Sequence, residues 1–343
     1  MQIITIGLDL AKHVFQVHGV GADGQIAIRR KLRRAEVVDF FSELAPCLVG
    51  MEACATAHHW GRQLKALGHE VRLMPPAYVK PFVKRQKNDA ADAEAICEAV
   101  LRPSMRFVPL KSAEQQGVLM LHRTRDLLIR QKTMLTNALR AHLAEFGIVE
   151  KLGRTGLELL IALVETEHGP DQPMLPPLAR ESLLMLVGQI RDLHARTTAI
   201  EKQIHIWHRS SEVSRRLETI PGVGPIIASA LAATVTDPTL FSSGRQLAAW
   251  LGLVPRQHST GGKERLRGIT KRGDPYIRRL LIIGAHAVLR FSRHRAPTAT
   301  WTSGLLTRRP AMVVAVALAN KMARIAWAIL ARGEVYRAPP IAA

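Results

Sequence analysis

The acidic residues of the N-terminal third are the first group whose types and spacing could support chemistry. Asp89 and Asp92 lie three residues apart in the alanine-rich stretch 87–95, which predicts a helix that begins near Asn88. Positions three apart share one face of a helix, so the two carboxylates would repel each other unless something compensates them. A first-turn acidic cluster favoured by the helix dipole, with Asn88 or Asp89 as the cap, is one explanation, and a metal site is the other.

Two further acids, Asp9 and Glu52, each end a short apolar run that is typical of a strand. Open α/β sheets carry their chemistry at the carboxyl ends of strands, although either acid alone could be a turn residue or a cap. Three such sites together favour a bound cation, because a desolvated carboxylate needs a partner. Oxygen ligands without His or Cys beside them favour Mg²⁺ over zinc, and paired Mg²⁺ ions in a basic protein favour phosphodiester chemistry.

A second candidate group is the pair Ser259 and Thr260, which lies in the glycine-rich basic segment 252–274. A serine in such a loop is by default a phosphate contact or a turn former. A nucleophilic serine would need neighbouring cations, and no general base is evident beside it except His258, which would point elsewhere in an extended segment. The residues alone leave both roles open. The cations that could serve either role are Arg256, Lys263, Arg265, Arg267, Lys271 and Arg272.

The segment 217–231 predicts a helix-hairpin-helix with Pro221-Gly222-Val223-Gly224 as its hairpin. Glycines at this place let backbone N–H groups approach a phosphate closely without reading sequence. We therefore expect Gly222 and Gly224 to contact nucleic acid, together with five of the cations above. Packing between the two helices is the alternative role of such a turn. The five cations are Arg256, Lys263, Arg267, Lys271 and Arg272.

The charge balance indicates a polyanionic partner. The 343 residues include 48 Lys and Arg against 28 Asp and Glu, which gives a formal net charge of +20. Nucleic acid is the leading partner for such a chain. A structural basic protein of ribosomal type is the alternative, but 47% hydrophobic residues over this length indicate substantial cores.

Cysteine usage and the chain ends indicate the compartment. Cys47, Cys54 and Cys97 lack the paired spacing of a zinc site or disulfide framework, which fits a reducing cytoplasm. No signal peptide precedes the first predicted strand. The apolar run 311–330 is interrupted by Asn320, Lys321 and Arg324, so we expect a buried helix and no membrane partner.

Strands and helices alternate in the first hundred residues, and this order predicts an α/β sheet with covered faces. Short apolar runs with alternating patterns predict the strands, and a glycine closes the second helix at residue 68. The predicted strands are 3–9, 14–20, 25–30, 47–52 and 70–74, and the predicted helices are 36–44 and 60–67.

Beyond the prolines at 103 and 109 the pattern becomes helical. An amphipathic helix with a basic face begins near Ser112, a loop follows at 169–177, and a second long helix spans about 183–200. We expect an antiparallel coiled-coil arm that pairs subunits, with a plain helical bundle as the alternative. A further helix is predicted at 276–290. The predicted domains are thus 1–110, the arm 111–210, and a mostly helical domain 211–343.

Three N-terminal blocks, 6–12, 51–53 and 87–93, resemble the Asp-Glu-Asp-Asp catalytic domain of one family of bacterial insertion-sequence transposases. Their N-terminal domain is of the Holliday-junction-resolvase (RuvC-like, ribonuclease-H) type. Asn88 stands where that family commonly has Thr, and either residue can cap a helix. Residues 252–274 and 319–327 resemble the family's C-terminal domain.

The resemblance implies specific roles. Asp9, Glu52, Asp89 and Asp92 would be catalytic Mg²⁺ ligands, and Ser259 matches the family's serine relative to Thr270-Lys271-Arg272-Gly273, with Thr260 as the fallback. The carboxylates of one subunit would work with the serine of another, which would form a transient covalent link to DNA. Better-studied members of the family are recombinases guided by a bridging RNA, so the resemblance also implies an RNA partner, a dimer or tetramer, and a nucleoid location.

Two other functions remain open from the sequence. One is a metal-dependent Holliday-junction endonuclease in which Ser259 only contacts phosphate. The other is a non-enzymatic basic nucleic-acid-binding protein in which the acids are structural. Substitution of Ser259 separates the transposase from the endonuclease, and substitution of Asp9 separates both enzymes from the binding protein.

Overall fold

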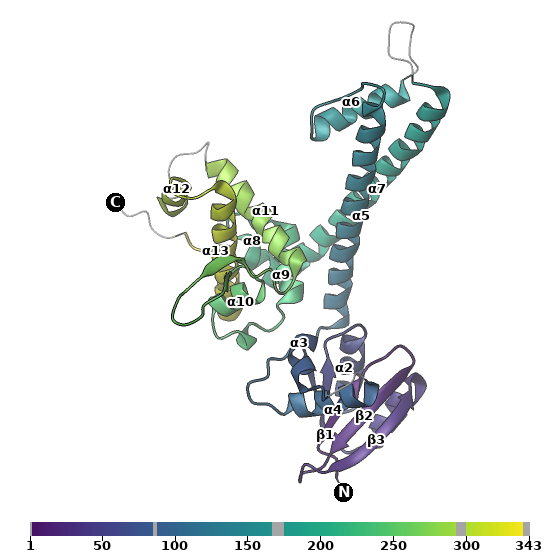
Figure 1. The fold of residues 1–343 in the computed structure, drawn as a ribbon, viewed down its shortest axis with the longest axis vertical. Helices are drawn as coiled ribbons and strands as arrows, with labels where there is room; N and C mark the ends of the chain where they lie inside the picture. Colours follow the sequence, from purple (N-terminus) through teal and green to yellow (C-terminus); the bar gives the residue numbers. More distant parts are fainter. Residues whose placement is uncertain (1, 85–87, 167–174, 293–299, 339–343) are drawn as a thin grey trace. The chain divides into compact units, whose positions relative to one another are not determined.

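The computed structural model describes residues 2–84, 88–166, 175–292 and 300–338. The chain forms two compact units (Figure 1). Unit 1 comprises residues 1–116 with 235–242, and unit 2 comprises residues 117–234 with 243–343. The first predicted domain boundary, at 110, lies close to the end of unit 1. The predicted arm and the predicted C-terminal domain fall together in unit 2, and their division into separate domains stays a prediction.

Unit 1 is built on a five-stranded sheet of order β3-β2-β1-β4-β5. The first three strands form an antiparallel meander, and β4 and β5 run parallel to β1. The mixed α/β sheet predicted from the alternating patterns is confirmed, with each strand within a few residues of its predicted bounds. The strands are β1 (Thr5–Asp9), β2 (Val14–Val20), β3 (Ile26–Arg33), β4 (Leu48–Glu52) and β5 (Glu70–Met74).

Helices cover both faces of this sheet, and successive side chains of each strand point alternately to the two faces. Ile6 and Leu8 of β1 belong to a core that includes the aromatic side chains of α1 and α2. In this core the ring of Phe15, from β2, meets the ring of Trp60, from α2, edge to face, with 5.1 Å between the ring centres. The helix α4 packs against β1, β2 and β4. The helices of unit 1 are α1 (Val37–Ser42), α2 (Ala57–Ala66), the short α3 (Pro76–Val79) and α4 (Asp89–Val100).

Unit 2 contains two long helices that run in opposite directions, α5 (Ala113–Ala144), of which residues from 117 belong to this unit, and α7 (Pro177–Ser210) (Figure 1). Between them lies α6 (Arg154–Glu165), which the sequence pattern did not predict. Apolar side chains from the end of α5, from α6 and from the first half of α7 share one core. The predicted loop 169–177 lies mostly outside the described residues, and coiled-coil packing of α5 with α7 stays a prediction.

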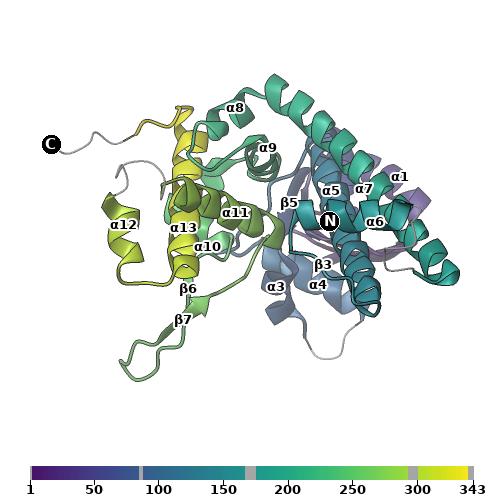
Figure 2. The same cartoon turned by 90° about the horizontal axis from the view of Figure 1, so that it is seen from above.

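The rest of unit 2 is mostly helical. Its one described sheet is a two-stranded hairpin, which Figure 2 shows extending away from the helices that carry it. The helix α13 (Ala311–Arg332) is long and apolar enough to cross a membrane by length and composition, and one of its faces is buried against α10 and α11. The other elements are α8 (Glu212–Glu218), α9 (Pro225–Thr234), α10 (Gly244–Trp250), β6 (Pro255–Gln257), β7 (Leu266–Ile269), α11 (Pro275–Ser292) and α12 (Thr300–Leu306).

Candidate functional site

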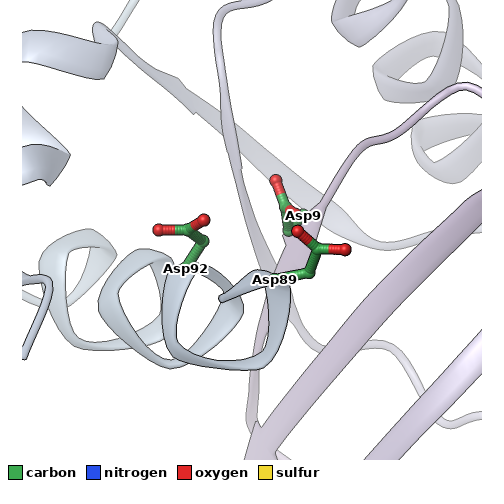
Figure 3. Close-up of side chains that lie close together, drawn as sticks. All are labelled: Asp9, Asp89 and Asp92. Carbon is green, nitrogen blue, oxygen red and sulfur yellow. The ribbon is translucent and has the colours of Figure 1, made fainter. Parts of the chain in front are cut away.

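Three of the four predicted acids meet at the edge of the sheet in unit 1. Asp9 is the last residue of β1, and Asp89 and Asp92 lie in the first turn of α4 (Figure 3). One carboxylate oxygen from each lies within 4.8 Å of the other two. Asp89 is exposed, whereas Asp9 and Asp92 are half-buried, so a cation and a phosphate can reach the group from solvent.

The start of α4 is fixed by its cap. The Asn88 side-chain oxygen accepts a hydrogen bond from the Ala91 N–H at 2.8 Å, and the Asn88 carbonyl accepts one from the Asp92 N–H at 3.0 Å. Of the two candidate caps, Asn88 and Asp89, the structure therefore selects Asn88. Because the cap fixes where the helix begins, it also fixes that Asp89 and Asp92 project from the same turn.

Two glycines bring α4 close enough to the sheet for its acids to reach Asp9. A Cβ atom on Gly7 would lie 2.2 Å from the Ala93 carbonyl oxygen and 2.4 Å from the Cys97 nitrogen, so no larger residue fits between β1 and α4. A Cβ atom on Gly50 of β4 would likewise meet Val100 at 2.8 Å. The glycines therefore permit direct packing of the helix on the strands.

Glu52 lies at the same edge of the sheet but outside the three-carboxylate group. β4 pairs with β1 in parallel, with Met51 opposite Leu8, so Glu52 follows beside Asp9. Met51 and Leu8 both point into the α1/α2 core, and Glu52 and Asp9 therefore share the opposite, α4-facing side. Burial of the Cys54 thiol raises its pKa, and the negative charges of Glu52 and Asp9 raise that pKa further. Both acids therefore lie near Cys54.

The donor set suits a hard divalent cation. Three carboxylates supply oxygen ligands only, and none of the other acidic, His or Cys side chains in the described part of the chain joins their group. Oxygen-only sites with open positions are typical of Mg²⁺ or Mn²⁺. The residues present thus fit such an ion, and its binding stays a prediction.

Ser259 lies on the hairpin of β6 and β7 in unit 2. The strands are three and four residues long, and a turn with Gly261 at φ +55° and Gly262 at φ +74° joins them. The Gln257 side-chain amide donates to the Ser259 hydroxyl oxygen at 3.1 Å. Both Ser259 and Thr260 are exposed. The sequence pattern did not single out Gln257, because its side chain can reach Ser259 only where the segment is extended, and no local signal predicted that conformation.

The cations predicted around Ser259 divide between the hairpin and its base. Arg256, Lys263, Arg265 and Arg267 are exposed on the hairpin, as are Lys271 and Arg272 at its base. Lys271 has φ +56°, and a Cβ atom on Gly273 would lie 1.8 Å from the Trp250 carbonyl oxygen, so the 270–273 turn is closely packed. Asp274 then caps α11 by accepting the Tyr276 N–H at 2.7 Å.

The glycine hairpin between α8 and α9 has two unlike glycines. Gly222 has φ +84°, and a Cβ atom there would meet the Gly284 carbonyl oxygen of α11 at 2.7 Å, which gives it a packing role. Gly224 has open space beside it. Nucleic-acid contact by Gly222 and Gly224 stays a prediction, and Gly224 has the more accessible backbone.

A buried histidine connects α5 with α9 and α11 through hydrogen bonds, and the sequence pattern did not predict it. His122 of α5 is 1% exposed and hydrogen-bonds Tyr276 Oη at 3.0 Å and Ser229 Oγ at 3.1 Å. Ser229 donates its own hydroxyl proton to the Pro225 carbonyl at 2.6 Å, so His122 Nε2–H donates to Ser229 and Nδ1 accepts from Tyr276. Burial, and next the Arg125 charge, lowers the pKa of His122 to about 4.

Two models of known protein families match this chain, one in its N-terminal half and one in its C-terminal half. The DEDD_Tnp_IS110 model, described as a transposase, matches residues 6–148. The model described as the transposase IS116/IS110/IS902 family matches residues 214–299. These ranges include the three grouped aspartates and the serine hairpin respectively.

Similar full-length proteins carry the same description. A probable family 20 transposase of Pseudomonas aeruginosa is 53% identical over 338 residues, covering 98% of this chain and 99% of that protein. The transposase for insertion sequence element IS1328 of Yersinia enterocolitica is 42% identical, covering 97% and 98%. The transposase for IS1111A of Coxiella burnetii is 40% identical, covering 98% and 92%. This chain therefore belongs to the IS110/IS116 family of insertion-sequence transposases.

Proposed function

We propose that this transposase cuts and rejoins DNA strands with two sets of groups, the carboxylates Asp9, Glu52, Asp89 and Asp92 and the hydroxyl of Ser259. The observation that carries the proposal is the meeting of Asp9, Asp89 and Asp92 within 4.8 Å at one sheet edge. A basic packaging protein has no use for three repelling carboxylates held together on a strand end and a helix turn.

The carboxylates are the metal-binding part. Transposase domains of the DEDD type use a divalent metal, and we assign Mg²⁺ here because the ligands are oxygens alone. A bound Mg²⁺ ion would supply Lewis-acid stabilisation of charge on phosphate oxygens. Glu52, on the same face as Asp9, would be the fourth carboxylate of the set. The antiparallel-then-parallel sheet with acids at the ends of β1 and β4 supports a RuvC-like domain.

Ser259 is the nucleophile in this proposal. Its Oγ forms a bond to the phosphorus atom of one strand, and the bond from that phosphorus to a sugar oxygen breaks. The departing sugar oxygen gains a proton, and the serine proton leaves to solvent or base. Attack by a sugar hydroxyl of another strand then releases the serine. Gln257 orients Oγ, and the hairpin arginines and lysine stabilise the charge on phosphate.

DNA is the substrate of a transposase, and the net charge of +20 supports extensive phosphate contact. We assign contacts to seven residues of unit 2: Gly222, Gly224, Arg256, Lys263, Arg267, Lys271 and Arg272. A guide RNA encoded by the mobile element would choose donor and target sequences. We also propose that the chain works in the bacterial cytoplasm in association with the nucleoid.

A homo-oligomer is proposed because the outer part of the arm exposes large apolar side chains. Leu152 is 88% exposed, Leu178 82% and Val149 77%, and all three lie in or beside α6 and the start of α7. Apolar side chains gathered at one end of a helical arm are typical of a protein interface. Pairing of subunits there would let the carboxylates of one subunit act with the Ser259 of another.

The covalent step provides the test. A suicide DNA substrate that prevents rejoining should accumulate a covalent protein–DNA species with the unaltered chain, and Ser259→Ala should abolish it. Thr260→Ala is the matched control and should retain the species. If Thr260→Ala abolishes the species and Ser259→Ala does not, Thr260 is the nucleophile.

The alternative function is a metal-dependent junction endonuclease in which Ser259 only contacts phosphate. Ser259 is exposed, and its one side-chain hydrogen bond within the described residues comes from Gln257, which favours that alternative. In that case Ser259→Ala would lose one hydrogen bond of about 0.5–1.5 kcal/mol and slow the reaction roughly tenfold at most. No covalent species would form with either variant.

A further inference from the structure

A groove beside α13 in unit 2 shares only Arg267 with the residues to which the proposed function assigns a role. Its volume is about 1100 Å³, and it is bounded by the start of α10, the base of the β6–β7 hairpin, α12 and one side of α13. We call it the α13 groove. Its floor is apolar and is lined by Trp301, Met312, Val313, Val316, Ile325 and Trp327.

Part of this floor faces solvent. Met312 is 59% exposed, Val313 52% and Trp301 43%. Other side chains of α13 form its buried face, so the core of unit 2 does not need these exposed apolar residues for its packing. Contiguous apolar surface of this kind, rimmed by polar groups, marks a binding site.

The rim carries one sign of charge. Arg245, Arg267, Lys321 and Arg324 line the groove, and no acidic side chain does so in the part of the chain that the structure describes. The Lys321 ammonium lies 4.8 Å from the centre of the Trp301 ring, so a cation and an exposed indole stand together. The occupant must therefore be anionic and must also offer flat apolar groups.

We propose that the α13 groove binds single-stranded nucleic acid, with phosphates on the cationic rim and unpaired bases on the apolar floor. Grooves that combine a basic edge with exposed aromatic rings bind single strands in this way. Duplex DNA keeps its bases stacked inside and could use only the rim. The volume of about 1100 Å³ lies at the upper end of the range of about 300–1,000 Å³ for ligand clefts, which leaves room for more than one unpaired base.

The groove continues into the hairpin of Ser259. Pro255 of β6 and Arg267, Gly268 and Ile269 of β7 all line it. An unpaired segment bound there would lie beside the strand that the hairpin engages. This placement rests on the proposed function of Ser259, but binding of a single strand in the groove does not.

Fluorescence anisotropy with a labelled oligo-dT of about twelve nucleotides tests the proposal, since single-strand site sizes are about 4–16 nucleotides. Trp301→Ala should weaken binding of this strand about 5- to 150-fold, because loss of one stacking ring costs about 1–3 kcal/mol. Binding of a duplex of the same length should change less than about twofold. Equal losses for both probes, or no loss for either, would overturn the proposal.

A matched pair of substitutions guards against misfolding. Val313→Glu places a negative charge on the exposed groove floor, and Val335→Glu makes the same change at a site 47% exposed in the segment that follows α13, outside the groove lining. Only Val313→Glu should weaken oligo-dT binding. Comparable circular dichroism and melting temperature would show that both variants fold, and equal binding by both would count against the groove.

Other occupants give different results. If Trp301→Ala instead abolishes binding to phosphatidylglycerol vesicles and leaves oligo-dT binding intact, the groove is a membrane contact and the proposal fails. If Val313→Glu changes the oligomeric state in light scattering without changing oligo-dT binding, the occupant is a second copy of the chain. The covalent-adduct assay of Ser259 is scored separately, so the groove and the serine chemistry can fail independently.

Discussion

The carboxylate edge of unit 1 and the serine hairpin of unit 2 are held in very different ways. Asp9, Asp89 and Asp92 sit on a paired strand and a capped helix that two glycines bring into direct contact. Ser259 sits in the segment that connects strands of three and four residues, and within the described part of the chain its one side-chain hydrogen bond comes from a neighbour two residues away. The difference indicates that three of the proposed metal ligands are already grouped within one chain. We expect the hairpin, in contrast, to acquire its working geometry on DNA.

The strongest effect should come from the preformed part. Asp92→Asn should lower strand cleavage by at least about 10³-fold, because metal stabilisation of phosphate charge is worth several kcal/mol. The free energy of unfolding should change by less than about 0.5 kcal/mol, since one of several repelling charges is removed. Cleavage of a labelled DNA and urea unfolding measure the two effects.

Asp39→Asn is the matched control for this prediction, since Asp39 also lies in the first turn of a helix of unit 1 and is exposed. It should leave cleavage unchanged. A large loss of stability in Asp92→Asn with cleavage per folded molecule preserved would mean that the acids are structural.

The close packing of α4 on β1 should be the next most sensitive feature. Gly7→Ala puts a Cβ atom against the backbone of Ala93 and Cys97, which should cost about 1–3 kcal/mol of stability. A shift of about 1 Å in α4 should also lower cleavage about 10²-fold, because Asp89 and Asp92 move with the helix.

Gly188→Ala in α7 is the control, because nothing lies within 4 Å of a Cβ atom there. It should stabilise the chain by about 0.5–1 kcal/mol, as Ala is the better helix former. Activity that survives Gly7→Ala undiminished would argue against a rigid carboxylate edge.

The packing of α5 against α9 and α11 around His122 should become less stable in acid. His122 has a pKa of about 4 in the folded chain against 6.5 in the unfolded chain, so the unfolded state takes up the proton first as pH falls. The stabilisation is fully present above pH 6.5 and is lost between pH 6.5 and 4, by at most about 3 kcal/mol. Hydrogen exchange in α5, α9 and α11 against pH measures this loss.

His122→Gln supplies the control, since glutamine has no proton to gain in this range. Its exchange rates should show a flatter dependence on pH between 6.5 and 4. An equal slope in both proteins would assign the acid sensitivity to other groups.

The smallest effect should come from the cap of α4. Asn88→Ala removes the acceptor for the Ala91 N–H and should cost about 1 kcal/mol of stability, whereas Asn88→Thr should cost only a few tenths. Thermal unfolding of the two variants checks the order. Equal stability of both would mean that the cap does not set the start of the helix.

Local patterns in the sequence predicted most of unit 1. Alternating apolar residues bounded by turn residues marked every strand of the sheet, and the acids at strand ends followed from that assignment. Asn88 carried its own cap signal. What the pattern could not supply was the approach of α4 to the sheet, because that distance depends on Gly7 and Gly50 facing one helix.

The sequence predicted less of unit 2, and for physical reasons. The strands of the serine hairpin are short and charged, so they carry no apolar alternation to detect. The partners of His122 lie 107 and 154 residues away along the chain, beyond any local signal. The α13 groove joins residues from α10, the hairpin, α12 and α13, and only folding brings these together.

A mixing experiment tests most directly whether the two regions of different subunits form one site. Asp9→Asn and Ser259→Ala chains, each inactive alone, are combined into mixed oligomers that two affinity tags verify, and strand exchange is then measured. The account predicts that the mixture regains activity, because intact carboxylates from one subunit meet an intact serine from the other. A mixture that stays inactive although mixed oligomers form would contradict the shared site.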